Sequence, residues 1–299
     1  MLLIRIPRRW ILEKSDTTIF VATGHESERQ AAEILADARE AGYESIEMCG
    51  YLTRRMPLLI RGFAATAGMP IGPCGKLDWR RIVRDSGMSV VSVHEDLGTI
   101  EKKPDLVAEE TAAFGTDTVV VTGMYKFDYS DADAVLRLAD ALSNAGRSLS
   151  ERGLRLLYHN HNCELARAGN ARAFDLIVDR TDPKYVGFEY DPYWMAEAGA
   201  DPLEWMERLG GRMRMWHVND RGFRPAGKTA SIRKSGGMEP GYGNMPLVRI
   251  AEKAAALGAE AAVLENHAPR SDIDPVRSVM LSAAFMNRYV GGASGKNAL

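Results

Sequence analysis

Residues 118–161 read TVVVTGMYKFDYSDADAVLRLADALSNAGRSLSERGLRLLYHNH. The apolar run Thr118–Val121 is typical of a buried strand, and a polar loop follows it. Ser130–Arg152 then carries apolar residues at helical spacing, and Gly153 ends the predicted helix. A second apolar run, Leu154–Tyr158, comes next. This order predicts two parallel strands joined by a helical crossover.

The same unit repeats in both directions along the chain. The other runs predicted as strands are Thr18–Val21, Ser45–Met48, Met88–Val93, Tyr185–Phe188, Met213–Trp216 and Ala261–Leu264. Predicted helices alternate with them at His25–Ala41, Leu77–Ser86, Pro104–Phe114, Ala171–Val178, Pro202–Leu209, Pro246–Leu257 and Asp274–Arg288. No Pro/Gly/Ser-rich linker divides these eight strands and their helices. The pattern predicts one α/β domain over residues 1–299, a single (β/α)8 TIM barrel, with residues 1–16 as an N-terminal arm.

Composition excludes several classes of protein. The chain is 45% hydrophobic and 26% charged, as in ordinary globular proteins. Its net charge of −2 gives no electrostatic support for binding nucleic acid, and no apolar run is long enough to predict a membrane span. The three cysteines, Cys49, Cys74 and Cys163, show no CxxC spacing, which disfavours a disulfide framework and a structural zinc site. The N-terminal residues do not have the order of a secretory signal, so we expect a cytoplasmic protein.

Polar side chains follow the predicted strands at their carboxyl ends, where the active site of such a barrel lies. They are His94, Glu95, Asp96, His159, Asn160, His161, Glu164, Glu189, Asp191, His217, Asp220, Glu265, Asn266 and His267. A lone histidine is weak evidence, but five of the chain's six histidines are in this set. Converging imidazoles and carboxylates favour Mn²⁺, Zn²⁺, Co²⁺ or Fe²⁺. Such an ion would polarise a carbonyl and stabilise an enediolate after proton abstraction from the adjacent carbon.

Six segments together resemble one known family. They are VSVHEDLG (91–98), LLYHNHNCEL (156–165), VGFEYDPYWMAEAGADP (186–202), MWHVND (215–220), EPGYGNMP (239–246) and AVLENH (262–267). On these segments the chain is identified as a member of the xylose isomerase-like TIM barrel superfamily, the sugar phosphate isomerase/epimerase proteins. The resemblance implies an isomerase or epimerase that uses one divalent ion, Mn²⁺ in the first place. It also implies a small carbohydrate or cyclitol as substrate, and it leaves homo-oligomerisation open.

The resemblance also implies residue roles. The implied metal ligands are His159, Asp191, His217 and Glu265. The implied catalytic residues are Glu265 and His159, with Glu265 as the acid/base group that also touches the metal. The implied substrate contacts are His94, His161, Trp194 and Asp220. Trp194 would form an apolar wall, and Asp220 would orient His217 or the Lys and Arg groups around it. His161 has the strand parity of His159 and stays an alternative ligand, whereas Glu47 and His267 are expected to be structural.

Two departures from the family pattern bear on the reaction. Many family epimerases carry Glu where this chain has His159, and free-ketose epimerases carry His where it has Trp194. Trp194 argues against epimerisation of a free ketose. His159 favours an alternative on the same site, a lyase that dehydrates an inosose or eliminates from a 3-keto-glycoside. A catalytically silent sugar-binding barrel is a further alternative. The longest irregular stretch, Gly222–Gly243, is predicted to be a functional loop such as a lid.

Overall fold

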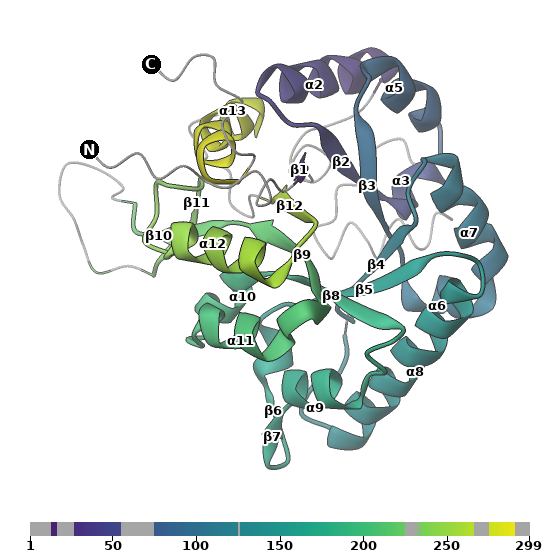
Figure 1. Ribbon diagram of the computed structural model, residues 1–299, viewed down its shortest axis with the longest axis vertical. Coiled ribbons are helices and arrows are strands. Elements are labelled where there is room, and N and C mark those ends of the chain that lie inside the picture. The colour runs from purple at the N-terminus through teal and green to yellow at the C-terminus, as the bar shows by residue number, and fades with distance from the viewer. Residues whose placement is uncertain are drawn as a thin grey trace.

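Eight parallel strands close into a barrel, in the order β1-β12-β9-β8-β5-β4-β3-β2 (Figure 1). The computed structural model describes residues 13–16, 27–54, 75–124, 126–224, 232, 234–265 and 275–290. The barrel strands are β1 (Glu13–Asp16), β2 (Ser45–Cys49), β3 (Ser89–His94), β4 (Thr118–Thr122), β5 (Arg155–His159), β8 (Val186–Tyr190), β9 (Met213–Val218) and β12 (Ala261–Leu264). Ser15 pairs with Val263 on one side and Ser45 on the other, so β1 closes the ring. The predicted TIM barrel is confirmed.

Helices surround this barrel (Figure 1). The longer ones are α2 (Glu28–Glu40), α5 (Trp79–Ser86), α7 (Pro104–Ala113), α8 (Ala132–Ser150), α9 (Ala173–Arg180), α11 (Pro202–Leu209), α12 (Leu247–Leu257) and α13 (Pro275–Phe285). The shorter ones are α3 (Gly50–Thr53), α6 (Leu97–Lys102) and α10 (Pro192–Glu197). In α8, Val135, Leu138, Leu142 and Leu149 recur at helical spacing and are buried. The side chain of Asp131 accepts the Ala134 N–H and caps that helix.

The first barrel strand differs from the sequence prediction. Thr18–Val21 lies outside the described residues, and the structure forms β1 from Glu13–Asp16, within the segment predicted as an arm. A short hairpin joins β6 (Arg167–Ala168) to β7 (Ala171–Arg172), so α9 begins at Ala173, two residues later than predicted. Backbone pairing in the hairpin takes up the first two residues of the predicted helix.

The barrel interior is filled below the strand ends. Val120, Leu157, Met215, Ala261 and Val263 form a small buried apolar cluster, separate from the large core between strands and helices. Side chains alternate along a strand, so residues two positions further on point to the same interior. The cluster is therefore a floor, and polar side chains nearer the carboxyl ends lie above it.

A second hairpin covers part of the predicted loop. Its two strands, β10 (Asp220–Gly222) and β11 (Gly236–Met238), pair in antiparallel fashion, and residues 223–235 of the chain connect them. Residues 225–231 and 233 of that loop lie outside the described part, so its prediction as a lid stays a prediction. None of the described helices has the length and hydropathy needed to cross a membrane.

Candidate metal centre

Strand alternation points several histidines and carboxylates into the barrel. His159 ends β5 two residues after Leu157, and His217 follows Met215 at the same spacing in β9. Leu157 and Met215 belong to the apolar floor, so both imidazoles lie above it on the same interior face. Glu265 comes directly after β12 and therefore lies at the same end of the barrel.

Four of these side chains form what we call the outer group: His159, Asp191, His217 and Glu265. One ligand atom from each lies within 4.8 Å of the others. Nδ1 of His217 lies 2.7 Å from Oε2 of Glu265, and the rings of His159 and His217 are 4.4 Å apart. Asp191 and His217 are buried, and the Glu265 side chain keeps 14% of its surface exposed. Two imidazole nitrogens and two carboxylates are a donor set that suits a divalent transition metal.

Asp191 is held in place by two sets of contacts. Its Oδ1 accepts the Tyr193 N–H at 2.8 Å and caps α10, while Oδ2 lies 3.5 Å from Nδ2 of Asn219. Its main chain is bonded to Asn160, whose Nδ2 donates to the Asp191 carbonyl at 3.1 Å and whose Oδ1 accepts the Asp191 N–H at 3.0 Å. A helix cap and a site carboxylate are thus combined in one residue.

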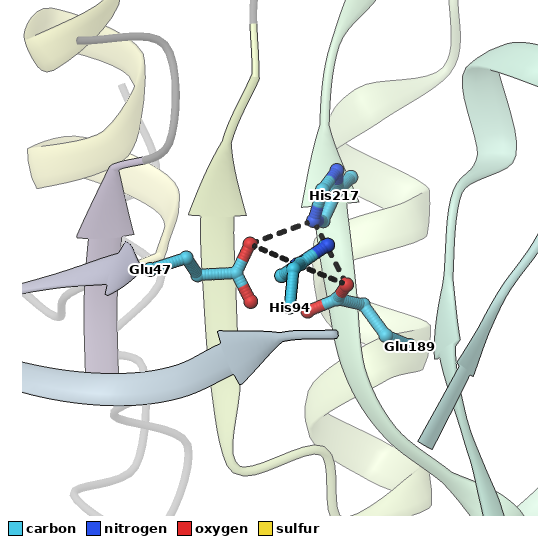
Figure 2. A group of neighbouring side chains, drawn as sticks. All are labelled: Glu47, His94, Glu189 and His217. Atoms are coloured by element: carbon cyan, nitrogen blue, oxygen red, sulfur yellow. Dashed lines mark hydrogen bonds and ion pairs between the residues drawn. The ribbon is translucent and has the colours of Figure 1, made fainter. Parts of the chain in front are cut away.

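A second cluster lies beside the outer group and shares His217 with it. This inner group consists of Glu47, His94, Glu189 and His217, with one ligand atom of each within 4.8 Å of the others (Figure 2). Nε2 of His217 lies 3.1 Å from Glu47 Oε2 and 3.2 Å from Glu189 Oε2. Glu189 Oε2 also lies 3.3 Å from Nδ1 of His159. A carboxylate bonded to the ring nitrogen that does not bind the metal fixes the orientation of a metal-binding histidine. Glu189 can act in this way on both His159 and His217, and Glu47 on His217.

The buried charges shift one another's protonation. Burial opposes an imidazolium at His94, but the carboxylates of Glu47 and Glu189 outweigh it and raise the pKa of His94 well above its usual range. The pKa of His217 is also raised well above its usual range, because Glu189 and Glu265 outweigh its burial. Burial favours a neutral Glu189, but His217 and the hydrogen bonds from three imidazoles hold its pKa well below the usual range.

His161 lies beside the outer group without joining it. Its ring is 4.9 Å from the His159 ring and 5.4 Å from the Trp194 ring. Its backbone N–H donates at 3.0 Å to the buried carboxylate of Glu164, which also accepts the Tyr158 hydroxyl at 2.9 Å. Burial raises the pKa of Glu164. The strand ends at His159, and the structure places His159, not His161, among the carboxylates.

Two of the residues predicted to contact substrate, His94 and Asp220, have several contacts within the protein. Nδ1 of His94 lies 2.9 Å from the Thr122 hydroxyl, and Nε2 faces Glu47 and Glu189, so both ring nitrogens are occupied. Asp220 was expected to orient His217 or the Lys and Arg groups around it. Its carboxylate instead accepts four backbone N–H groups, from Arg221, Gly241, Gly243 and Met245. Asp220 therefore anchors the 239–246 segment, which the sequence motif did not reveal.

Comparison with known proteins agrees with this architecture. The family described as xylose isomerase-like TIM barrel matches residues 35–289, most of the chain. The chain belongs to the xylose isomerase-like TIM barrel family. The metal-site candidate of this barrel lies at the carboxyl ends of the strands, as the fold leads us to expect.

Individual relatives are distant. An inosose dehydratase of Geobacillus kaustophilus is 31% identical over 28% of this chain and 26% of its own length, so the chain matches only about a quarter of that relative. A sugar phosphate isomerase/epimerase structure from Parabacteroides distasonis aligns with a TM-score of 0.71 at 19% identity, covering 98% of this barrel and 100% of that chain. The structure of the IOLI protein with a bound zinc atom aligns with a TM-score of 0.64 at 12% identity, covering 95% of this chain and 100% of that chain. At such identities the structures show the shared fold.

Proposed function

We propose that this barrel is a divalent-metal-dependent isomerase or epimerase of a sugar, keto-sugar or cyclitol, which abstracts a proton next to a carbonyl. The observation that carries the proposal is the outer group, in which one ligand atom each of His159, Asp191, His217 and Glu265 converges at the catalytic end of the barrel. The family membership supports an enzyme that acts on small sugars.

The donor set fits a metal ion, with Mn²⁺ as our first choice and Zn²⁺, Co²⁺ or Fe²⁺ as alternatives. The four outer-group side chains would hold it, and Glu189 would fix the ring of His159 through Nδ1. A divalent ion bound there supplies charge that polarises a carbonyl and favours deprotonation of the adjacent carbon. Zinc in a structure of the same fold supports an ion in such a barrel.

Glu265 is the group we assign to proton transfer. Its side chain is 14% exposed, whereas Asp191 and His217 are buried and His159 is 2% exposed. Glu265 is therefore the member of the outer group that reaches furthest toward the open end of the barrel. We place His159 beside it in the catalytic machinery. The rings of His161 and Trp194 stand next to the outer group and would bound the substrate.

A lyase on the same site is the second candidate. Epimerisation by two opposed carboxylates needs a second accessible acid/base group, and His159 occupies the fifth-strand position in the outer group. Elimination needs one base and a leaving group, which Glu265 and a hydroxyl on the substrate would satisfy. The short match to an inosose dehydratase supports this candidate too.

Metal-loaded protein incubated in D₂O with inososes, keto-sugars and 3-keto-glycosides separates the candidates. An isomerase or epimerase gives a product of conserved formula that carries solvent deuterium at the carbon next to the carbonyl. A lyase gives a product that has lost water or an alcohol. If no substrate shows metal-dependent exchange or turnover, both enzyme proposals fail and a silent sugar-binding barrel remains.

A further inference from the structure

The inner group has the composition and geometry of a metal site of its own. Its members come from four different strands, β2, β3, β8 and β9, and their polar atoms point toward one another (Figure 2). We propose that Glu47, His94, Glu189 and His217 bind a second divalent cation of the zinc class, and that His217 bridges it to the outer group. This inference goes beyond the proposed function, which requires the outer ion alone.

The spacing within the inner group fits ligands around an ion. Nε2 of His94 lies 3.1 Å from Glu47 Oε2 and 3.3 Å from Glu189 Oε2. The corresponding distances from Nε2 of His217 are 3.1 and 3.2 Å. Tetrahedral zinc ligands at about 2.0–2.1 Å from the ion lie about 3.3 Å from one another, close to these distances.

Hydrogen bonding alone accounts for this pattern less well. A single ring N–H points in one direction and cannot align with two carboxylates at once. Charge-assisted N–H···O bonds are also shorter, at about 2.7–2.9 Å. Two nitrogens that each stand nearly equidistant from the same two carboxylates therefore favour a shared cation between them.

Glu189 adds an independent observation. It is fully buried, and its Oε1 has no hydrogen-bond partner in the described part of the chain. Its Oε2 is approached only by imidazoles there, those of His94, His159 and His217. A buried carboxylate with one oxygen that lacks a donor is costly, and a cation beside its other oxygen would offset part of that cost.

The ligand chemistry selects the class of ion. Two imidazole nitrogens and two carboxylate oxygens suit Zn²⁺ better than Mg²⁺ or Ca²⁺, which prefer oxygen ligands. His217 presents Nδ1 to the outer group and Nε2 to the inner group. A ring that bridges two ions carries a proton on neither nitrogen, so binding of both ions would release the ring protons of His217 to solvent.

Metal stoichiometry of the full-length protein tests this proposal. The protein is stripped with a chelator, reloaded with excess Zn²⁺, desalted and analysed for zinc per chain. Glu47→Gln removes an inner ligand, Asp191→Asn removes an outer ligand, and Glu40→Gln changes an exposed carboxylate on α2 as the matched control. We expect about two zinc ions per chain in the wild type and in Glu40→Gln, and about one in each of the other variants.

The outcomes distinguish this inference from the proposed function. One ion per wild-type chain that is lost in Asp191→Asn but kept in Glu47→Gln overturns the inner site and leaves the outer site standing. One ion that is lost in Glu47→Gln but kept in Asp191→Asn supports the inner site and contradicts the outer one. If Glu47→Gln does not fold, electron paramagnetic resonance of Mn²⁺-loaded wild type decides. A spin-coupled pair supports the proposal, and the spectrum of isolated Mn²⁺ overturns it.

Discussion

The side-chain amide of Asn160 makes two hydrogen bonds to the main chain of Asp191: Nδ2 donates to the carbonyl at 3.1 Å, and Oδ1 accepts the N–H at 3.0 Å. Both residues are buried. The two bonds join the end of β5 to the end of β8 and fix the point at which the chain leaves the barrel toward α10. The position of the Asp191 carboxylate therefore depends on Asn160. Among the described hydrogen bonds, the Asn160 side chain makes none to the other three residues of the outer group.

Asn160→Ala should weaken metal binding. Loss of both bonds leaves the buried Asp191 amide unpaired, which costs about 1–3 kcal/mol of unfolding free energy. Because a misplaced supporting residue lowers metal affinity by about 10–100-fold, we expect a loss of that size. Isothermal titration with Zn²⁺ or Mn²⁺ and denaturant unfolding measure the two effects. Asn162→Ala, at an exposed position in the same loop, should change neither quantity, and unchanged affinity in Asn160→Ala would remove Asn160 from the account.

Gly243→Ala should destabilise the protein through Asp220. A Cβ at position 243 would lie 2.4 Å from Asp220 Oδ1 and 2.6 Å from the Arg221 carbonyl oxygen. Relieving that overlap disturbs the backbone bonds to Asp220, and we expect a loss of about 1–3 kcal/mol of unfolding free energy. Gly211→Ala is the control, since a Cβ there meets no heavy atom within 4 Å. Equal stability of the two variants would contradict the anchoring role of Asp220.

Stability of the metal-free protein should depend on pH through the inner group. The folded-state pKa values of His94 and His217 are raised above 6.5, so their stabilising contribution is fully present below that pH. It is lost as the pH rises through the raised values. Unfolding free energy should therefore decline above pH 6.5, and the decline should be smaller in His94→Gln. Metal affinity should change in the opposite direction, because His217 must lose its proton to bind an ion. Unfolding free energy that rises over this range would contradict the charge arrangement.

Glu265→Gln should abolish most turnover at saturating metal. Removing the group assigned to proton transfer costs about 10²–10⁴-fold in rate. The matched control is Glu260→Gln at the opposite end of β12, where the carboxylate pairs with Arg155 and Arg214 on the far rim. Steady-state assays with the substrate found in the deuterium screen measure both variants. Activity in Glu265→Gln close to that of Glu260→Gln would assign proton transfer to another residue.

Much of the fold could be predicted because its signals are local. Seven of the predicted apolar runs coincide with described barrel strands. Gly87 and Gly258 directly follow α5 and α12, whose apolar residues recur at helical spacing. The first strand could not be placed, since Glu13–Asp16 has a polar sequence and is a strand only through its pairing with β12 and β2. Tertiary pairing overrode local propensity at this position.

The contacts within the candidate metal centre could be predicted from the sequence less well than the fold. His159 and His217 end apolar runs, and that local pattern marked them. Glu47 was expected to be structural, and the contacts of Glu189 and Asn160 were not foreseen, because each contact depends on register between strands distant in the chain. Glu189 lies two residues before Asp191, and this spacing is a signal that could have placed its side chain on the same face of the strand. Asp220 lies in a motif next to His217, but three of its four backbone partners come from residues 241–245, which no local pattern indicates.

Anomalous diffraction from crystals of the Zn²⁺-loaded protein tests the outer group most directly. We predict a peak at the zinc edge within coordinating distance of Asp191 and Glu265, with His159 and Nδ1 of His217 completing the ligand set. A fully loaded crystal with no peak among these four side chains would contradict the proposed metal-dependent enzyme.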